Sequence, residues 1–136
     1  MVHEAAIEFL RKNPRCVLAT YRRDGHAQLS PILAAVDAEA RAVISTREGA
    51  IKTLNLRRNP RAALCVLSER FFGAWQTLEG DVEIVSLPDA MEPLVDYYRR
   101  LSGEHPDWQD YRQAMERERR VLVRITVDRS GPTAQG

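Results

Sequence analysis

The sequence has few of the features that mark secreted, membrane or nucleic-acid-binding proteins. Only two of its 136 residues are cysteines. Cys16 and Cys65 each lie in an apolar, strand-like run, so we expect reduced core thiols rather than a disulfide. No apolar run approaches the roughly 20 residues that cross a bilayer, and Glu4 and Glu8 do not fit a secretory signal peptide. The formal net charge of +1 gives no bias toward nucleic acid or anionic lipid. We therefore expect a cytoplasmic protein that binds neither nucleic acid nor a membrane.

The motifs of the common catalytic classes are also missing. The sequence contains no phosphate loop, no G-x-G-x-x-G after a strand and no serine in a nucleophile elbow. Its histidines (His3, His26 and His105) have no cysteine or histidine partner at metal-ligand spacing, so we expect no metal. His26 follows a turn glycine and has no evident carboxylate partner, which predicts an exposed turn residue. The basic segments 56–61 and 117–120 lack interleaved aromatic residues and are interpreted as solvated helix ends. Catalytic residues stay unassigned.

The hydrophobic pattern predicts a single domain over residues 1–136 with short strands and a few helices. We expect helices over 3–12, 48–58, 88–103 and 106–119, and strands over 15–21, 28–36, 41–46, 62–67, 72–85 and 121–127. Pro31 cannot donate to a strand ladder, which indicates an edge or a bulge, and Gly80 suggests a bulge in its strand. The helix over 48–58 is expected to have Ile51, Leu54 and Leu56 on its apolar face. Residues 130–136 are expected to be frayed. This order fits an antiparallel barrel with helices outside it.

One segment has the residues of a phosphate site. Ser45 and Thr46 end a predicted strand, and Lys52 and Thr53 lie early in the helix that follows. Hydroxyl groups, free amides at a helix N-terminus and a lysine one turn in can bind an anion. The same residues also suit helix capping and a solvated lysine, so both interpretations stay open.

Several segments, in this order and spacing, resemble the pyridoxamine 5′-phosphate oxidase-like split-barrel superfamily. The resemblance covers about residues 4–128 and is carried by Val17–Thr20, Asp24–Gly25, Gln28–Pro31, Lys52–Arg61 and Leu78–Gly80. Two further segments, Tyr98–Trp108 and Asp110–Met115, resemble a narrower branch, the actinobacterial reductases that use the deazaflavin coenzyme F420.

The resemblance implies an α+β fold, an antiparallel FMN-binding split β-barrel with peripheral helices. It also implies a homodimer with two sites at the subunit interface. The coenzyme phosphate would lie near Ser45, Thr46, Lys52 and Asn55, the ring would lie against the strand Gln28–Ile32, and Trp75 would approach from the partner subunit. Some relatives carry a second basic residue where this chain has Ala50, so either Arg47 replaces it or the site prefers the less charged FMN. The implied cofactor-binding set is Gln28, Ser30, Pro31, Ile32, Ser45, Thr46, Arg47, Lys52, Asn55 and Trp75.

The activity implied by the resemblance is an oxidoreductase that transfers a hydride from reduced F420 to an electron-poor unsaturated small molecule. Two alternatives stay open: an FMN-binding oxidase or reductase, and a non-catalytic coenzyme-binding protein. Plainer interpretations also survive for single residues. Lys52 could be a solvated lysine, Trp75 could pack a dimer interface, and Gln28 and Ser30 could be ordinary strand residues. Trp108 and Tyr111 are expected to pack the two C-terminal helices.

Overall fold

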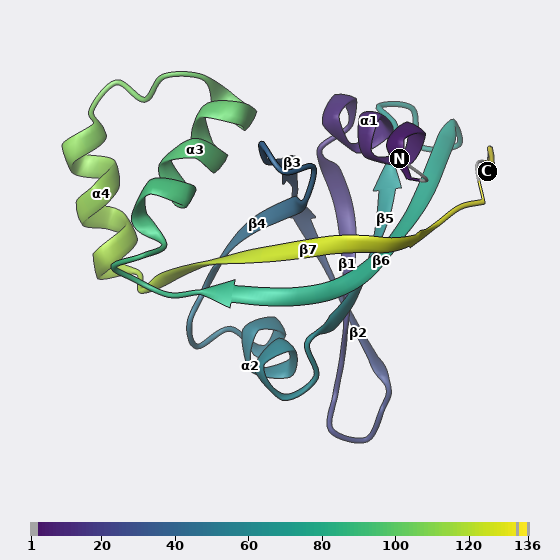
Figure 1. Ribbon diagram of the computed structural model, residues 1–136, viewed down its shortest axis with the longest axis horizontal. Coiled ribbons are helices and arrows are strands. Elements are labelled where there is room, and N and C mark those ends of the chain that lie inside the picture. The colour runs from purple at the N-terminus through teal and green to yellow at the C-terminus, as the bar shows by residue number, and fades with distance from the viewer. Residues whose placement is uncertain (1–2, 133, 136) are drawn as a thin grey trace.

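The computed structural model describes residues 3–132 and 134–135, in which one curled antiparallel sheet is surrounded by four helices (Figure 1). The strands follow the order β2-β1-β5-β6-β7-β4-β3, with β8 beside β6. The predicted α+β split barrel is therefore confirmed. In chain order the elements are α1 (Glu4–Lys12), β1 (Arg15–Tyr21), β2 (Ala27–Leu33), β3 (Ala35–Val36), β4 (Ala42–Arg47), α2 (Ile51–Arg58), β5 (Arg61–Leu67), β6 (Ala74–Val85), α3 (Met91–Ser102), α4 (Trp108–Arg117), β7 (Arg120–Ser130) and β8 (Ala134–Gln135).

The inside of the barrel is the main hydrophobic core, and it follows from alternation along the strands. Residues at every second position of β1 and β5 are buried, with Leu18 and Leu64 fully enclosed. Cys16 belongs to this core, and burial raises the pKa of its thiol to about 12. Both cysteines are free, but Cys65 lies one position out of phase and is only half-buried. The expectation that both thiols lie in the core is therefore wrong for Cys65, which points to the outer face.

A second, smaller core lies outside the barrel, where α3 and α4 pack against β3, β4 and β7 (Figure 1). Leu94 of α3 and Met115 of α4 are buried against Val43 and Leu122. The Tyr111 hydroxyl donates to the Leu94 carbonyl at 2.8 Å, and Trp108 meets the Tyr111 ring edge-on at 5.5 Å. Both aromatic residues pack the helical pair, as predicted.

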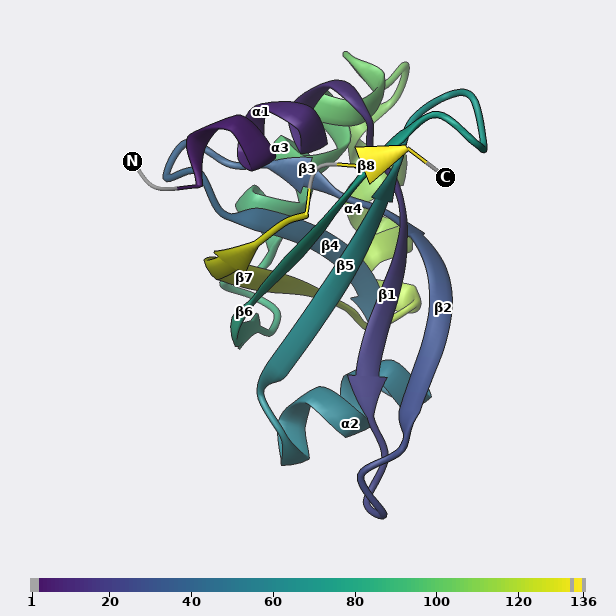
Figure 2. The ribbon, with the colours of Figure 1, turned by 90° about the vertical axis from the view of Figure 1, so that its right-hand side faces the viewer.

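The outer face of β2, β1 and β5 lies on the other side of the barrel from these helices (Figure 2). Leu29 pairs with Ala19, and Ala19 pairs with Ala63, so an apolar row crosses three strands on this face. Leu29 is 66% exposed and Leu33 is 47% exposed. We call this the open sheet face.

The irregular positions in the strands are at the proline and the glycine that the sequence analysis identified. Pro31 lies in β2, which pairs only with β1 and is therefore an edge strand, as predicted. The pairing of β6 with β7 shifts register between Glu79 and Gly80, which confirms the bulge. A Cβ on Gly80 would overlap the Thr126 carbonyl group. This close approach requires glycine there.

Three further expectations are corrected. The first concerns α2, which exposes Ile51 (59%) and Leu54 (50%) and buries Thr53, Asn55 and Leu56. The second concerns the C-terminus: β7 continues to Ser130, and Ala134–Gln135 pairs with Ala74–Trp75, so the segment is not simply frayed; residues 133 and 136 lie outside the described residues. The third is that α3 begins at Met91, three residues after Pro88. Among the described residues, no helix has both the length and the apolar character that a bilayer crossing requires.

Candidate functional site

The barrel is split along one side, between β2 and the second half of β4. β2 has a strand neighbour on one edge only. The short β3 pairs with β4 only at Ala42 and Val43, so Ser45–Arg47 has a strand neighbour only on its β7 side. Tyr97 of α3 joins the two sides, because its hydroxyl donates to the Leu33 carbonyl at 2.8 Å and lies within hydrogen-bonding reach of the Ser45 backbone. We call this opening the split; the predicted β2 and β4 residues lie on its two sides.

A group of cations lies at the α2 end of the split. Lys52 is half-buried, and burial together with the nearby Arg120 lowers the pKa of its ammonium group. Within residues 3–132, no carboxylate lies within 4.0 Å of this ammonium. Arg120 begins β7 directly opposite Arg47 on β4. Glu118 is shared between them, 2.8 Å from Arg120 and 3.8 Å from Arg47. Two arginines that share one carboxylate, with Lys52 next to one of them, suit an anionic ligand.

Sequence reasoning missed Arg120, because it is contributed by a strand that follows 62 residues after the end of α2. The available signal was the basic run 117–120, which was interpreted as a solvated helix end. A hollow of about 340 Å³ borders this arginine and is lined by Glu48, Ser86, Leu87, Arg119, Arg120 and Val121. The cationic end of the split is therefore open to a ligand that extends past Arg120.

The start of α2 leaves its backbone amides without a side-chain cap. Its N-cap residue is Ala50, which has extended backbone angles and makes no capping hydrogen bond. Thr53 donates its hydroxyl to the Arg47 carbonyl at 2.6 Å instead. Thr46, at 3% exposure, lies against Thr53 inside the barrel, whereas Ser45 is half-buried on the opposite side of β4. None of these three hydroxyl groups therefore caps α2. Thr46 points into the barrel and away from the solvent-facing cations.

Asn55 faces the barrel and is 4% exposed. Its Nδ2 donates to Thr20 Oγ1 at 3.1 Å and to Gln28 Oε1 at 3.3 Å. Its Oδ1 accepts from Arg58 Nη2 at 2.9 Å. The Asn55 amide thus ties α2 to β1 and β2, and its two N–H groups are used within the protein rather than offered to a phosphate.

The β2 residues of the predicted set divide between two faces. Gln28, Ser30 and Ile32 are half-buried and share one face of the strand, whereas Pro31 is exposed on the other face, opposite Val17. Trp75 lies at the end of β6 that is far from α2. Asp81 of β6 pairs with Arg61, the first residue of β5 after α2, and Trp75 precedes Asp81 by six residues. Six strand residues span about 20 Å. Within one chain, Gln28, Ser30 and Ile32 therefore lie on one side of the split and Ser45, Arg47 and Lys52 on the other, whereas Trp75 lies at the end of β6 away from α2.

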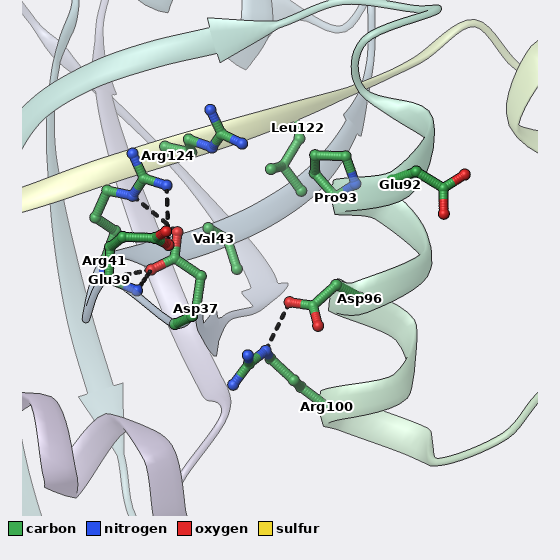
Figure 3. A pocket seen from close by; sticks show the side chains of 11 residues that line it. Asp37, Glu39, Arg41, Val43, Glu92, Pro93, Asp96, Arg100, Leu122 and Arg124 are labelled. Carbon is green, nitrogen blue, oxygen red and sulfur yellow. Dashed lines mark hydrogen bonds and ion pairs between the residues drawn. The ribbon is translucent and has the colours of Figure 1, made fainter.

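Other charged positions are accounted for by structure. His26 is an exposed residue of the β1–β2 hairpin tip, as predicted, although the Asp24 carboxylate lies 3.4 Å from its Nδ1. A hollow of about 290 Å³ lies between α3 and the outer side of β4 and β7 (Figure 3). Its charges are largely paired with one another, Arg41 with Asp37 and Arg100 with Asp96. It is separate from the split and has none of the predicted residues.

Residues 2–133 match the sequence profile of pyridoxamine 5′-phosphate oxidase. The chain belongs to the pyridoxamine 5′-phosphate oxidase family. Among solved structures, this family member is similar to the conserved hypothetical protein Rv2991 of Mycobacterium tuberculosis, with 26% identity over 96% of this chain and 82% of that one and a TM-score of 0.76. A protein named F420 reductase has 24% identity over 91% and 94% of the two chains and a TM-score of 0.69. The heme storage protein HutZ of Vibrio cholerae has the same fold at 14% identity, covering 98% and 95%, with a TM-score of 0.69.

Proposed function

We propose that the protein is an oxidoreductase that binds reduced coenzyme F420 in the split and uses it to reduce an electron-poor unsaturated small molecule. The observation that carries the proposal is the half-buried Lys52 beside Arg120, with no carboxylate of residues 3–132 in contact, because a bound phosphate would relieve this repulsion. Membership of the pyridoxamine 5′-phosphate oxidase family and the similarity to the F420 reductase support the same class of activity.

The residues present fit a cofactor with one anionic end and one planar end. Lys52 and Arg120 would hold the phosphate, with the uncapped amides of α2 beside them. Gln28 and Ser30 on β2 would contact the ring edge. When bound, reduced F420 supplies a hydride to the acceptor. The chain's own contribution is then to hold the two reactants at near-attack distance, which accounts for up to several kcal/mol of barrier lowering.

The protein is further proposed to be a homodimer. The open sheet face has Leu29 at 66% exposure in an apolar row, and a second copy related by a twofold axis would cover it. Trp75, at the start of β6, pairs with Leu67 of β5 and so lies beside this face; pairing of two copies through it would bring Trp75 of one protomer toward the partner's split. The separation of Trp75 from Lys52 within one chain agrees with a shared site.

FMN remains the second candidate cofactor, because Glu118 partly neutralises Arg47 at 3.8 Å. An Arg47 engaged in this way leaves fewer cations for the acidic tail of F420, and Ala50 adds none. Arg47→Ala separates the two coenzymes. Weaker binding of F420 with unchanged binding of FMN would show that Arg47 contacts the acidic tail.

Titration of the apoprotein with F420 and with FMN, followed by coenzyme fluorescence, tests the proposal. We expect F420 to bind more tightly. Coenzyme deuterated at its hydride position should then place the label on the product carbon. Tighter binding of FMN, with rapid reoxidation of the reduced protein by oxygen, would overturn the F420 assignment in favour of the flavin. Binding of neither coenzyme would overturn both.

A further inference from the structure

The buried amide of Asn55 has only one orientation that satisfies its neighbours. A guanidinium group has donors and no acceptor, so the Asn55 atom that faces Arg58 Nη2 at 2.9 Å is the carbonyl oxygen Oδ1. The Nδ2 group consequently faces Thr20 and Gln28. The charge on Arg58 thereby fixes which end of the Asn55 amide points toward β2.

The orientation of Asn55 in turn fixes the amide of Gln28. Because Asn55 Nδ2 is a donor, the Gln28 atom 3.3 Å away is the acceptor Oε1. The remaining polar atom of Gln28 is Nε2, whose two hydrogens are donors. No residue within 3–132 accepts a hydrogen bond from it. Gln28 is half-buried on the same face of β2 as Ser30, beside the split.

We propose that Arg58 and Asn55 are positioning residues that hold the Gln28 amide with its Nε2 as a hydrogen-bond donor to a ring carbonyl of the bound coenzyme. This inference rests on the proposed function and assigns Asn55 a different role from the phosphate contact that the family resemblance implied. Neither Asn55 nor Arg58 touches the coenzyme in this scheme. The ligand class selected is a planar ring with a carbonyl oxygen at its edge, a feature that flavins and deazaflavins share.

Asn55→Asp reverses the donor and acceptor roles in the series of hydrogen bonds from Arg58 through residue 55 to Gln28. The introduced carboxylate still accepts from Arg58, but it cannot donate to Gln28 Oε1. The Gln28 amide then turns over to donate its Nε2 to that carboxylate, which leaves Oε1 facing the ring carbonyl. Two acceptors in contact lose the hydrogen bond and repel each other, so we expect Kd to rise by about tenfold or more. Riboflavin is the main probe, because it has the ring carbonyls and no phosphate charge.

A double-mutant cycle separates this effect from general damage. In a Gln28→Ala background, Asn55→Asp should change the Kd of riboflavin by less than about threefold, because the amide that it would turn over is gone. Repeating the cycle with FMN measures the direct repulsion between the new carboxylate and the phosphate, since that term persists in the Gln28→Ala background. Arg58→Met provides a second variant that leaves the buried residues unchanged. It should weaken riboflavin binding by a few fold through the loss of amide orientation.

Thr20→Val is the matched control. Thr20 is 1% exposed and accepts from the same Asn55 nitrogen, but it lies on β1 and does not contact the ligand in the proposed arrangement. It should lower Tm and leave Kd unchanged. The infrared carbonyl bands of bound riboflavin give an independent signature: Asn55→Asp should shift a ring carbonyl band to higher frequency, and Thr20→Val should not.

The outcomes are distinguishable. If wild-type protein binds neither F420 nor a flavin, the proposed function fails. If wild-type binds but Asn55→Asp has the same effect with and without Gln28, or leaves the carbonyl bands unmoved, the positioning role is wrong and Asn55 is only a structural tie. Should Asn55→Asp fail to fold, an unchanged Kd in Arg58→Met would still overturn the inference.

Discussion

Replacement of Lys52 by methionine should have opposite effects on the stability of the apoprotein and on coenzyme binding. The ammonium group is half-buried next to Arg120, and both burial and that charge lower its pKa. Within the described part of the chain, no carboxylate compensates it. The charged form is therefore less favourable in the folded apoprotein than in the unfolded chain, whereas a bound phosphate would favour it. Replacing a residue that serves only packing would not raise stability while weakening coenzyme binding.

The expected magnitudes follow from the partial exposure of Lys52. Because solvent screens the group, Lys52→Met should stabilise the apoprotein by less than about 1 kcal/mol, which corresponds to a rise in Tm of roughly 2–4 °C at most. Loss of a charge-assisted contact should weaken coenzyme binding by about 1–3 kcal/mol. That range corresponds to roughly 5- to 150-fold in Kd.

The lowered pKa of Lys52 also sets the sign of the pH dependence. In the folded apoprotein the cost of the charge is fully present below the lowered pKa, and it disappears as pH rises toward the ordinary value of 10.5. A bound phosphate raises the pKa of Lys52 again, because it stabilises the charged ammonium. Coenzyme affinity should consequently fall as pH rises through the lowered pKa of Lys52, and Lys52→Arg should move this fall to higher pH.

Thermal unfolding and coenzyme fluorescence titration measure the two effects on the same samples. The chain has one other lysine, Lys12, which is exposed at the end of α1, so Lys12→Met is a matched control that should change neither quantity. A lower Tm with an unchanged Kd in Lys52→Met would refute the reasoning, because Lys52 would then be a structural residue and the anionic group of the coenzyme would bind elsewhere.

Three further predictions concern the bulge, the chemistry and the open sheet face. Gly80→Ala should destabilise the fold by about 3 kcal/mol in urea unfolding, because the new Cβ would lie 2.6 Å from the Thr126 carbonyl carbon; an unchanged midpoint would mean that the two strands separate without cost. His26→Ala and Glu79→Gln should each lower turnover by less than about tenfold, or about 1.4 kcal/mol, since the first is exposed and the second pairs with an arginine; a larger loss would identify an acid–base residue. Cys65, on the open sheet face, should be alkylated slowly at micromolar concentration and faster on dilution; a rate independent of concentration, together with a monomer in sedimentation, would contradict the dimer.

The strands could be predicted because their burial is set by local alternation. β1 was predicted with its exact bounds, and Pro31 and Gly80 were assigned to an edge and a bulge, because backbone chemistry limits those residues in any context. The C-terminal elements could be predicted less accurately. The C-terminal pairing of Ala134–Gln135 with β6 depends on where a distant strand lies, which a polar segment does not encode.

The candidate site was predictable only where its parts are close in sequence. Ser45, Arg47 and Lys52 come together because a short connection joins β4 to α2. Arg120 could not be assigned to them, because its place opposite Arg47 is a matter of strand register. The role of Asn55 also depended on tertiary structure, since its partners lie on two other strands.

The error in α2 itself points to the functional part of the fold. An amphipathic helix normally buries its apolar stripe, and α1 does so with Ile7 and Leu10. α2 instead turns Thr53 and Asn55 into the barrel and leaves Ile51 exposed. That arrangement gives up apolar burial, so it persists only because the buried polar groups find partners in the barrel wall. Local rules are broken most often at functional sites, and α2 is the helix that both positions Gln28 and contributes Lys52.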